Sequence, residues 1–136
     1  DLGPLTAETA TSEYPFGDPT GARLAAAGFM QGFSRGWQGD DGRSAHVVVY
    51  EMKDPNAFMT SWKAAVKDVA NGGTFTTPVG DGLRDIESDA EGENPSEASI
   101  VAWVEGPYWY YVVHFGPADG TGPDHARAVV AAVQAK

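Results

Sequence analysis

The chain has 136 residues, of which 42% are hydrophobic and 11% aromatic, and its 19 Asp and Glu against 9 Lys and Arg give a net charge of −10. This length and composition indicate one globular domain with a single core rather than a disordered chain. The acidic balance argues against nucleic-acid backbones and anionic membranes as partners, because both would repel it. The sequence contains no cysteine, which excludes disulfides, thiolate metal sites and cysteine nucleophiles.

The first 21 residues differ in composition from the rest, being rich in Thr, Ala, Glu, Pro and Gly. We therefore predict a linker-like segment over 1–21 and a single α+β domain over 22–136. No apolar run approaches the length that spans a bilayer, so we expect no direct membrane insertion. A leader of this composition is compatible with a signal or lipid anchor removed from the N-terminus.

The segment 28–51 predicts a β-hairpin. Over Phe29–Gln38, period-two spacing places Phe29, Phe33 and Trp37 on one face together with Arg35, and it predicts that the aromatic side chains lie on the buried side. A polar turn with two glycines follows, and the next strand is expected over Ser44–Met52. Apolar residues on both faces of this second strand indicate an interior position in the sheet.

A helix is predicted directly after this hairpin. Asp54 followed by Pro55 is typical of an N-cap and a first helical residue. Apolar residues at helical spacing, including Phe58 and Trp62, predict that the helix continues to about Ala70.

The remaining elements complete the predicted fold. A loop is expected over 74–82, a short strand over 83–88, and strands over 99–105 and 108–115, with Asp124 capping a last helix. The element order is ββαβββα. It predicts an α+β fold in which an antiparallel sheet of about five strands has two amphipathic helices packed on one side.

The strand over 108–115 is the most aromatic part of the chain. Period-two alternation places Tyr108, Tyr110 and His114 on one face. If the helices cover the other face, these side chains are displayed to solvent, a ligand or a partner. Exposed tyrosines offer a large contact area at low entropic cost. With Arg35 and Trp37 they form the predicted ligand- or partner-binding set, although a sheet covered on both faces stays an alternative.

Chemical motifs are weak throughout the sequence. His46, His114 and His125 have no metal-ligand neighbour at the usual helical or strand spacings, although His46 and His114 lie on strands where they could meet across the sheet. No nucleophile elbow or phosphate-binding loop is present. We therefore predict no catalytic residue, no metal site and no cofactor.

Acidic residues alternate in the segment 85–97, as oxygen ligands do in calcium loops. The match to an EF-hand fails because Gly92 lies at the eighth position rather than the sixth and no flanking helices are predicted. We expect a solvated loop, and cation binding by this segment stays open. The carboxylates concerned are Asp85, Glu87, Asp89, Glu91, Glu93 and Glu97.

The segment AAGFMQGFSRGWQGDDGRSAHVVVYEMKDPNAF resembles a group of uncharacterised exported proteins and lipoproteins of actinobacteria. In that group an aromatic strand, a charged turn, a second strand and a helix follow in this order. TTPVGDGLRDIE is similar to a later loop of the group, although Asp81 and Arg84 make it more polar here. The matching positions of the first segment are Ala27, Gly28, Phe29, Gly32, Phe33, Arg35, Trp37, Val49, Tyr50, Glu51, Ala57 and Phe58.

The resemblance extends over about 28–136 and implies a PsbP-like α+β sandwich, an extracytoplasmic location, and a binding or accessory role rather than a fixed chemistry. The sequence thus favours a non-enzymatic domain that recognises a small ligand or an envelope protein. The alternative is a protein–protein interaction subunit of a secreted or cell-surface assembly. A metal-dependent hydrolase built on His46, His114 and the acidic segment has the least support.

Overall fold

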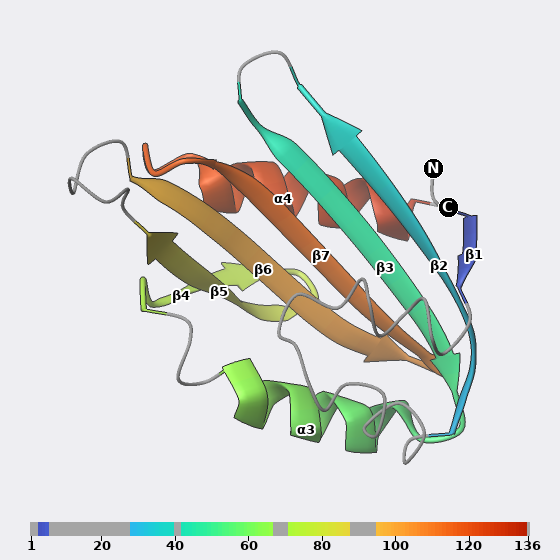
Figure 1. Ribbon diagram of the computed structural model, residues 1–136. Coiled ribbons are helices and arrows are strands. Elements are labelled where there is room, and N and C mark those ends of the chain that lie inside the picture. The colour runs from blue at the N-terminus through green and yellow to red at the C-terminus, as the bar shows by residue number, and fades with distance from the viewer. Residues whose placement is uncertain (1–2, 6–27, 40–41, 67–70, 88–94, 136) are drawn as a thin grey trace.

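The computed structural model describes residues 3–5, 28–39, 42–66, 71–87 and 95–135 (Figure 1). These residues form one seven-stranded antiparallel sheet, in the order β1-β2-β3-β7-β6-β5-β4, and two helices. The α+β class is confirmed, and the sheet has more strands than the five expected. The elements are β1 (Gly3–Leu5), β2 (Phe29–Gln38), β3 (Ser44–Met52), α3 (Pro55–Val66), β4 (Thr74–Thr77), β5 (Gly80–Glu87), β6 (Ser96–Glu105), β7 (Tyr108–Pro117) and α4 (Gly122–Gln134).

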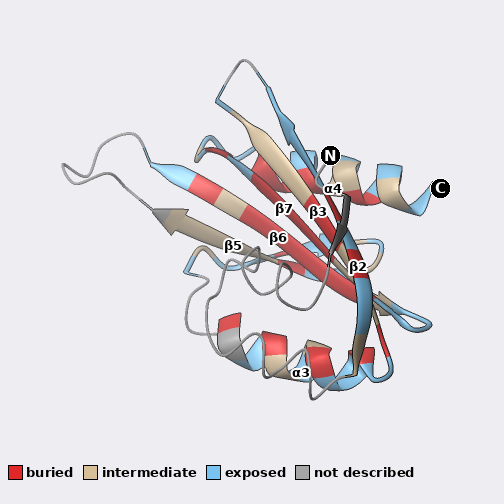
Figure 2. Cartoon of the chain, turned by 45° about the vertical axis from the view of Figure 1, so that its right-hand side comes forward, coloured by how far each residue is buried: buried red, intermediate tan, exposed pale blue. Residues whose placement is uncertain are grey.

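The two helices lie on opposite faces of the sheet (Figures 1 and 2). Helix α3 packs with Val48 of β3 in one core cluster, whereas α4 packs with Val47 in another. Adjacent residues of a strand point to opposite faces, so these clusters occupy the two sides of the sheet. The expectation of two helices on one side is therefore wrong. Because β3 and β7 carry apolar side chains on both faces, each face needs a helix to cover it.

The core under α3 is aromatic. The ring of Trp109 is fully buried, stacks on Tyr50 at a centroid distance of 5.4 Å and meets Phe58 edge-on at 4.8 Å. Trp62 of the same helix meets Trp109 at 5.8 Å. Such contacts add to the large apolar area that each ring buries. This cluster fixes α3 against the centre of the sheet.

The predicted start of α3 is confirmed. The backbone N–H of Ala57 donates to Oδ1 of Asp54 at 3.0 Å, and Pro55 is the first helical residue. The helix is described as far as Val66, and the expected continuation to Ala70 lies outside the described residues. The expected cap of α4 is wrong. Thr121 occupies the N-cap position, so Asp124 lies within the first turn.

The segment expected to be a loop over 74–82 forms the β4–β5 hairpin instead. Val79 N–H donates to the hydroxyl of Thr77 at 3.1 Å, and that hydroxyl donates to the carbonyl of Gly80 at 2.5 Å. Gly80 takes a φ of 128°, which glycine adopts without strain. The side-chain hydrogen bonds of Thr77 close the turn, so β5 begins three residues before the expected position.

The acidic segment also differs from the expected loop where it is described. Strand β5 continues to Glu87, and β6 begins at Ser96 rather than at Ser99. Glu97 is 1% exposed and accepts a hydrogen bond of 2.6 Å from Nε of Arg84. Its carboxylate is thus part of the folded sheet. The expected behaviour of 88–94 concerns residues outside the described part.

Strand β1 falls inside the segment predicted to be a linker, and it pairs with β2 over Gly32, Phe33 and Ser34. The remainder of 1–21 lies outside the described residues. The predicted β2–β3 hairpin is present, and Gly39 N–H donates to the carbonyl of Arg43 at 2.8 Å across its turn. In the described ranges, neither helix has the length and apolar character that a membrane crossing requires.

Candidate functional site

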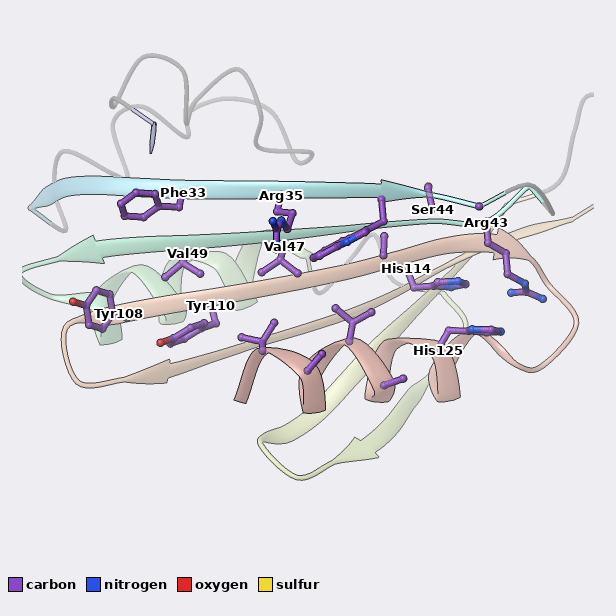
Figure 3. Close-up of a pocket in the computed structure, with 17 residues that line it drawn as sticks. Phe33, Arg35, Arg43, Ser44, Val47, Val49, Tyr108, Tyr110, His114 and His125 are labelled. Atoms are coloured by element: carbon purple, nitrogen blue, oxygen red, sulfur yellow. The ribbon is translucent and has the colours of Figure 1, made fainter. Parts of the chain in front are cut away.

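A groove of about 820 Å³ lies between α4 and the sheet (Figure 3). It arises because α4 packs mainly on β7 and β6, and at most slightly on β3 and β2. The same face of β2 therefore forms a wall beside the helix, with β3 between them. The volume is within the range of small-molecule sites.

The wall formed by β2 is aromatic and exposed. Phe33, Arg35 and Trp37 alternate along the strand, and all three line the groove. The exposed fraction is 49% for Phe33 and 47% for Trp37. The Arg35 guanidinium carbon lies 5.7 Å from the centre of the Trp37 ring, within the range of a cation–π contact. Large apolar side chains that stay this exposed mark surfaces that meet a ligand or a partner.

The floor of the groove comes from β3 and β7. Val47 opposes Val112 and Val49 opposes Tyr110 in the antiparallel register. The other wall is the exposed flank of α4, to which Val129 and Val133 contribute. Both helix residues are only partly buried, because one side of each packs against the core cluster between α4 and the sheet. The middle of the groove is consequently aliphatic on two sides.

Tyr110 is fixed by its neighbours. Its ring stacks on Trp103 at a centroid distance of 4.8 Å and an interplanar angle of 4°. Burial raises the pKa of its phenol, and the nearby Glu105 and Tyr108 raise it further. The phenol therefore stays neutral at physiological pH and can donate a hydrogen bond. Tyr108 is 37% exposed and lies at the aromatic end of the groove.

The opposite end of the groove is basic. His114 of β7 is 4% exposed and stacks on His125 of α4, with ring centroids 4.7 Å apart and planes 7° apart. Arg43 lines the same end, forms an ion pair with Asp119 and donates to Oγ1 of Thr121 at 3.1 Å. Figure 3 shows these basic side chains together, away from Phe33 and Tyr108.

Asp119 sits beside this end rather than in the groove lining. Its pKa is lowered to about 2, first by hydrogen bonds from the hydroxyl and backbone N–H of Thr121, then by the charge of Arg43. The carboxylate is thus ionised across the physiological range and holds the loop before α4 against Arg43. Among the described residues that line the groove itself, none is Asp or Glu.

The structure brings the five residues predicted for binding together on this groove: Arg35, Trp37, Tyr108, Tyr110 and His114. They come from β2 and β7, which are separated by β3. One premise of that prediction is wrong, because their face of the sheet is covered by α4 in part. The offset of the helix leaves them accessible along a groove rather than displayed on an open sheet.

Sequence reasoning missed the contribution of α4. Val129 and Val133 recur at helical spacing, which is typical of core positions, yet each has one side in the groove. His125 gave no signal, since its contact with His114 joins residues on separate elements. Period-two spacing placed Phe33 on the same face as Arg35 and Trp37, as the structure shows. The prediction that this aromatic face is buried is wrong for Phe33 and Trp37, because α4 does not cover β2 and both rings stay about half exposed.

His46 and His114, which could have met across the sheet, do not. Ala45 is the register partner of His114, and His46 opposes Val113. His46 therefore points to the face of α3, and His114 to the face of α4. Within the described ranges, no group of three or more His, Asp or Glu side chains is placed to hold a metal ion.

Comparison of the chain with protein-family models, with curated proteins and with solved structures finds no match. The chemistry of the groove is therefore the basis for assigning a function.

Proposed function

We propose that this chain is a non-enzymatic binding domain that takes up a small molecule with a large apolar part in the groove between α4 and strands β2, β3 and β7. The observation that supports the proposal most is the exposure of Phe33 and Trp37, each close to half exposed, on the wall of a groove whose floor is aliphatic in the middle. Covering these rings with a ligand would remove apolar surface from water, which is the main driving force of such binding.

An extracytoplasmic location is part of the proposal. It rests on the resemblance to exported actinobacterial proteins and on the linker-like composition of 1–21. Fractionation of the source cells followed by detection with an antibody tests it. Recovery of the protein only from the cytoplasmic fraction would contradict this part and leave the binding function untouched.

A thermal-shift screen of lipids, sugars, aromatic acids and other metabolites tests the binding function. A ligand that binds only the folded state stabilises it by RT ln(1 + c/Kd), where c is the free ligand concentration, so the melting temperature rises with that concentration. The matched variant is Ala132→Trp, because Ala132 lines the groove and is exposed, so a large ring there fills the groove without entering the core. Ala64→Trp on the exposed side of α3 is the control.

The proposal expects at least one compound to stabilise the wild type and the Ala64→Trp control, but not Ala132→Trp. Stabilisation that survives in Ala132→Trp would place the ligand outside the groove and contradict the proposal. A screen without any stabiliser would favour the second candidate function.

That second candidate is recognition of a protein partner, and it is supported by the edge of the sheet. Strand β1 pairs with Gly32, Phe33 and Ser34, and among the described residues no strand pairs with the outer edge of β2 from Gly36 to Gln38. Such an edge can accept a strand from a partner. Capture from the native secretome by wild type, but not by a Gly36→Pro variant that disrupts strand pairing, tests this candidate.

A further inference from the structure

We infer that the ligand is a long-chain carboxylate, with its head at the basic end formed by Arg43, His114 and His125 and its chain along the valine floor towards Phe33 and Tyr108. The inference rests on the proposed function of the groove as a ligand site, and it adds the charge, the shape and the orientation of the ligand.

The charge of the groove is opposite to that of the protein. The chain carries a net charge of −10, yet the described lining contains two arginines and two histidines and no carboxylate. On an acidic protein, a cleft lined by basic groups concentrates the field and attracts anions. The positive side chains of the described lining therefore attract an anion. A protonated amine would find no Asp or Glu in that lining with which to form an ion pair.

The polarity of the groove changes along its length, as it does along an amphiphile. His114 and Tyr108 are six residues apart on β7, which corresponds to about 20 Å at the usual rise per strand residue. His125 and Val133 are eight residues apart on α4, or about 12 Å. Between the basic and the aromatic end, the floor and the helix wall offer the apolar side chains of Val47, Val49 and Val129, and Arg35 lies opposite Val47 on the β2 wall.

The basic end of the groove is only partly covered. His114 is 4% exposed and the Arg43 side chain is 14% exposed, whereas His125, whose ring stacks on His114, is exposed. His125 is therefore the basic side chain that a carboxylate head can reach most directly. A hydrogen bond from an arginine or an imidazole N–H to a carboxylate is charge-assisted, and such bonds are among the stronger ones in proteins.

The intrinsic fluorescence of the protein offers a direct probe. Trp37 is 47% exposed on the groove wall, whereas Trp62, Trp103 and Trp109 are each at most 4% exposed. Trp37 opposes Ala45, which is the register partner of His114, so its ring lies near the basic end of the groove. A ligand whose head lies at that end covers the indole, and the emission should shift to shorter wavelength. The Trp37→Phe variant should lose this spectral shift, because the other three tryptophans are buried.

The test compares three probes with the same chain, each below its micelle concentration: dodecanoate, dodecan-1-ol and dodecylamine. Calorimetric titration should give an affinity for dodecanoate at least tenfold above that for the alcohol, with the amine weakest. His125→Gln should lower the dodecanoate affinity about fivefold or more and leave the alcohol affinity unchanged. Lys63→Gln, on the opposite helix and exposed, removes a positive charge away from the groove and should change neither.

Equal affinities for the three probes would contradict the inference that the carboxylate head lies at the basic end. An unchanged dodecanoate affinity in His125→Gln would contradict it as well. Neither result would contradict binding in the groove. The protein could bind a screened compound, lose that binding in Ala132→Trp, and still not bind dodecanoate. That result would contradict the inference that the ligand is a carboxylate, and it would leave the proposed function in place. Binding to phospholipid vesicles without binding to free dodecanoate would also overturn the inference. Dodecanoate binding that persists in Ala132→Trp would contradict the groove itself.

Discussion

The guanidinium of Arg84 donates two hydrogen bonds to the carboxylate of Glu97, at 2.6 and 3.1 Å, and thereby joins β5 to β6. Glu97 is almost fully buried, and the hydroxyl of Ser99 lies 3.5 Å from the same carboxylate. A Cβ added to Gly122 would come within 3.5 Å of this carboxylate, so the pair lies beneath the start of α4. A charge in this position is tolerated only because its partner is present.

Arg84→Met should lower the free energy of unfolding by about 3–5 kcal/mol, because it leaves the buried carboxylate of Glu97 without its counter-ion. The double variant Arg84→Met/Glu97→Met should recover a large part of that loss, since no buried charge remains. Urea unfolding of the two single variants and the double variant gives the coupling energy. Additive losses would show that the two side chains stabilise the fold independently.

Phe33 and Phe58 should respond differently to truncation. Phe58 is 1% exposed in the aromatic core, so Phe58→Ala should cost about 3–5 kcal/mol of stability. Phe33 is 49% exposed on the groove wall, and Phe33→Ala should cost less than about 1 kcal/mol. Denaturant midpoints measure both. A large loss for Phe33→Ala would mean that its ring stabilises the fold rather than the groove.

Two strand glycines offer a matched test of packing. A Cβ at Gly82 would lie 2.3 Å from Cζ of Phe75, a ring that packs in the core under α4, whereas a Cβ at Gly36 would find its nearest neighbour at 3.9 Å. Gly82→Ala should therefore destabilise the protein by about 1–3 kcal/mol through overpacking. Gly36→Ala should stay within about 1 kcal/mol of the wild type. Thermal unfolding compares the pair, and similar melting temperatures would contradict the close approach of Phe75.

The Asp119 carboxylate should make stability depend on pH in the acid range. Its pKa falls from 3.8 to about 2 on folding, so the folded state binds fewer protons than the unfolded state between these values. Its contribution is present above pH 3.8 and is lost as the pH falls towards about 2. Asp119→Asn should therefore be less stable than the wild type at neutral pH, with a difference that narrows near pH 2. A difference that stays constant over this range would contradict the ionised pairing with Arg43 and Thr121.

Local patterns in the sequence predicted most of the secondary structure correctly. Period-two alternation identified β2, β3 and β7, and the pair Asp54–Pro55 identified the start of α3. The turn at Thr77 was not predicted, because a side-chain hydroxyl closes it and it lacks a glycine-rich pair of turn residues. The burial of Glu97 was not predicted, because its counter-ion, Arg84, lies on the neighbouring strand and is 13 residues away in the sequence. Spacing along the chain does not report such contacts.

The placement of the helices could not be predicted from their stripes alone. An amphipathic stripe shows that a helix packs on something apolar, but both faces of β3 are apolar. The same ambiguity affected the candidate site. Alternation grouped Tyr108, Tyr110 and His114 correctly, whereas the groove exists because α4 packs on β7 and β6 and leaves β2 beside it. Lateral offset of a helix is a property of the packed structure.

The two faces of the sheet differ in how much their side chains contribute to the stability of the fold. The face under α3 holds the interlocked rings of Tyr50, Phe58, Trp62 and Trp109, whose loss would unfold the domain. The groove wall on the other face is built from side chains that are still partly open to solvent. Substitutions there are free of the constraint that fixes the aromatic core. A lineage of such domains can therefore change what its groove accepts, one residue at a time, while every intermediate still folds.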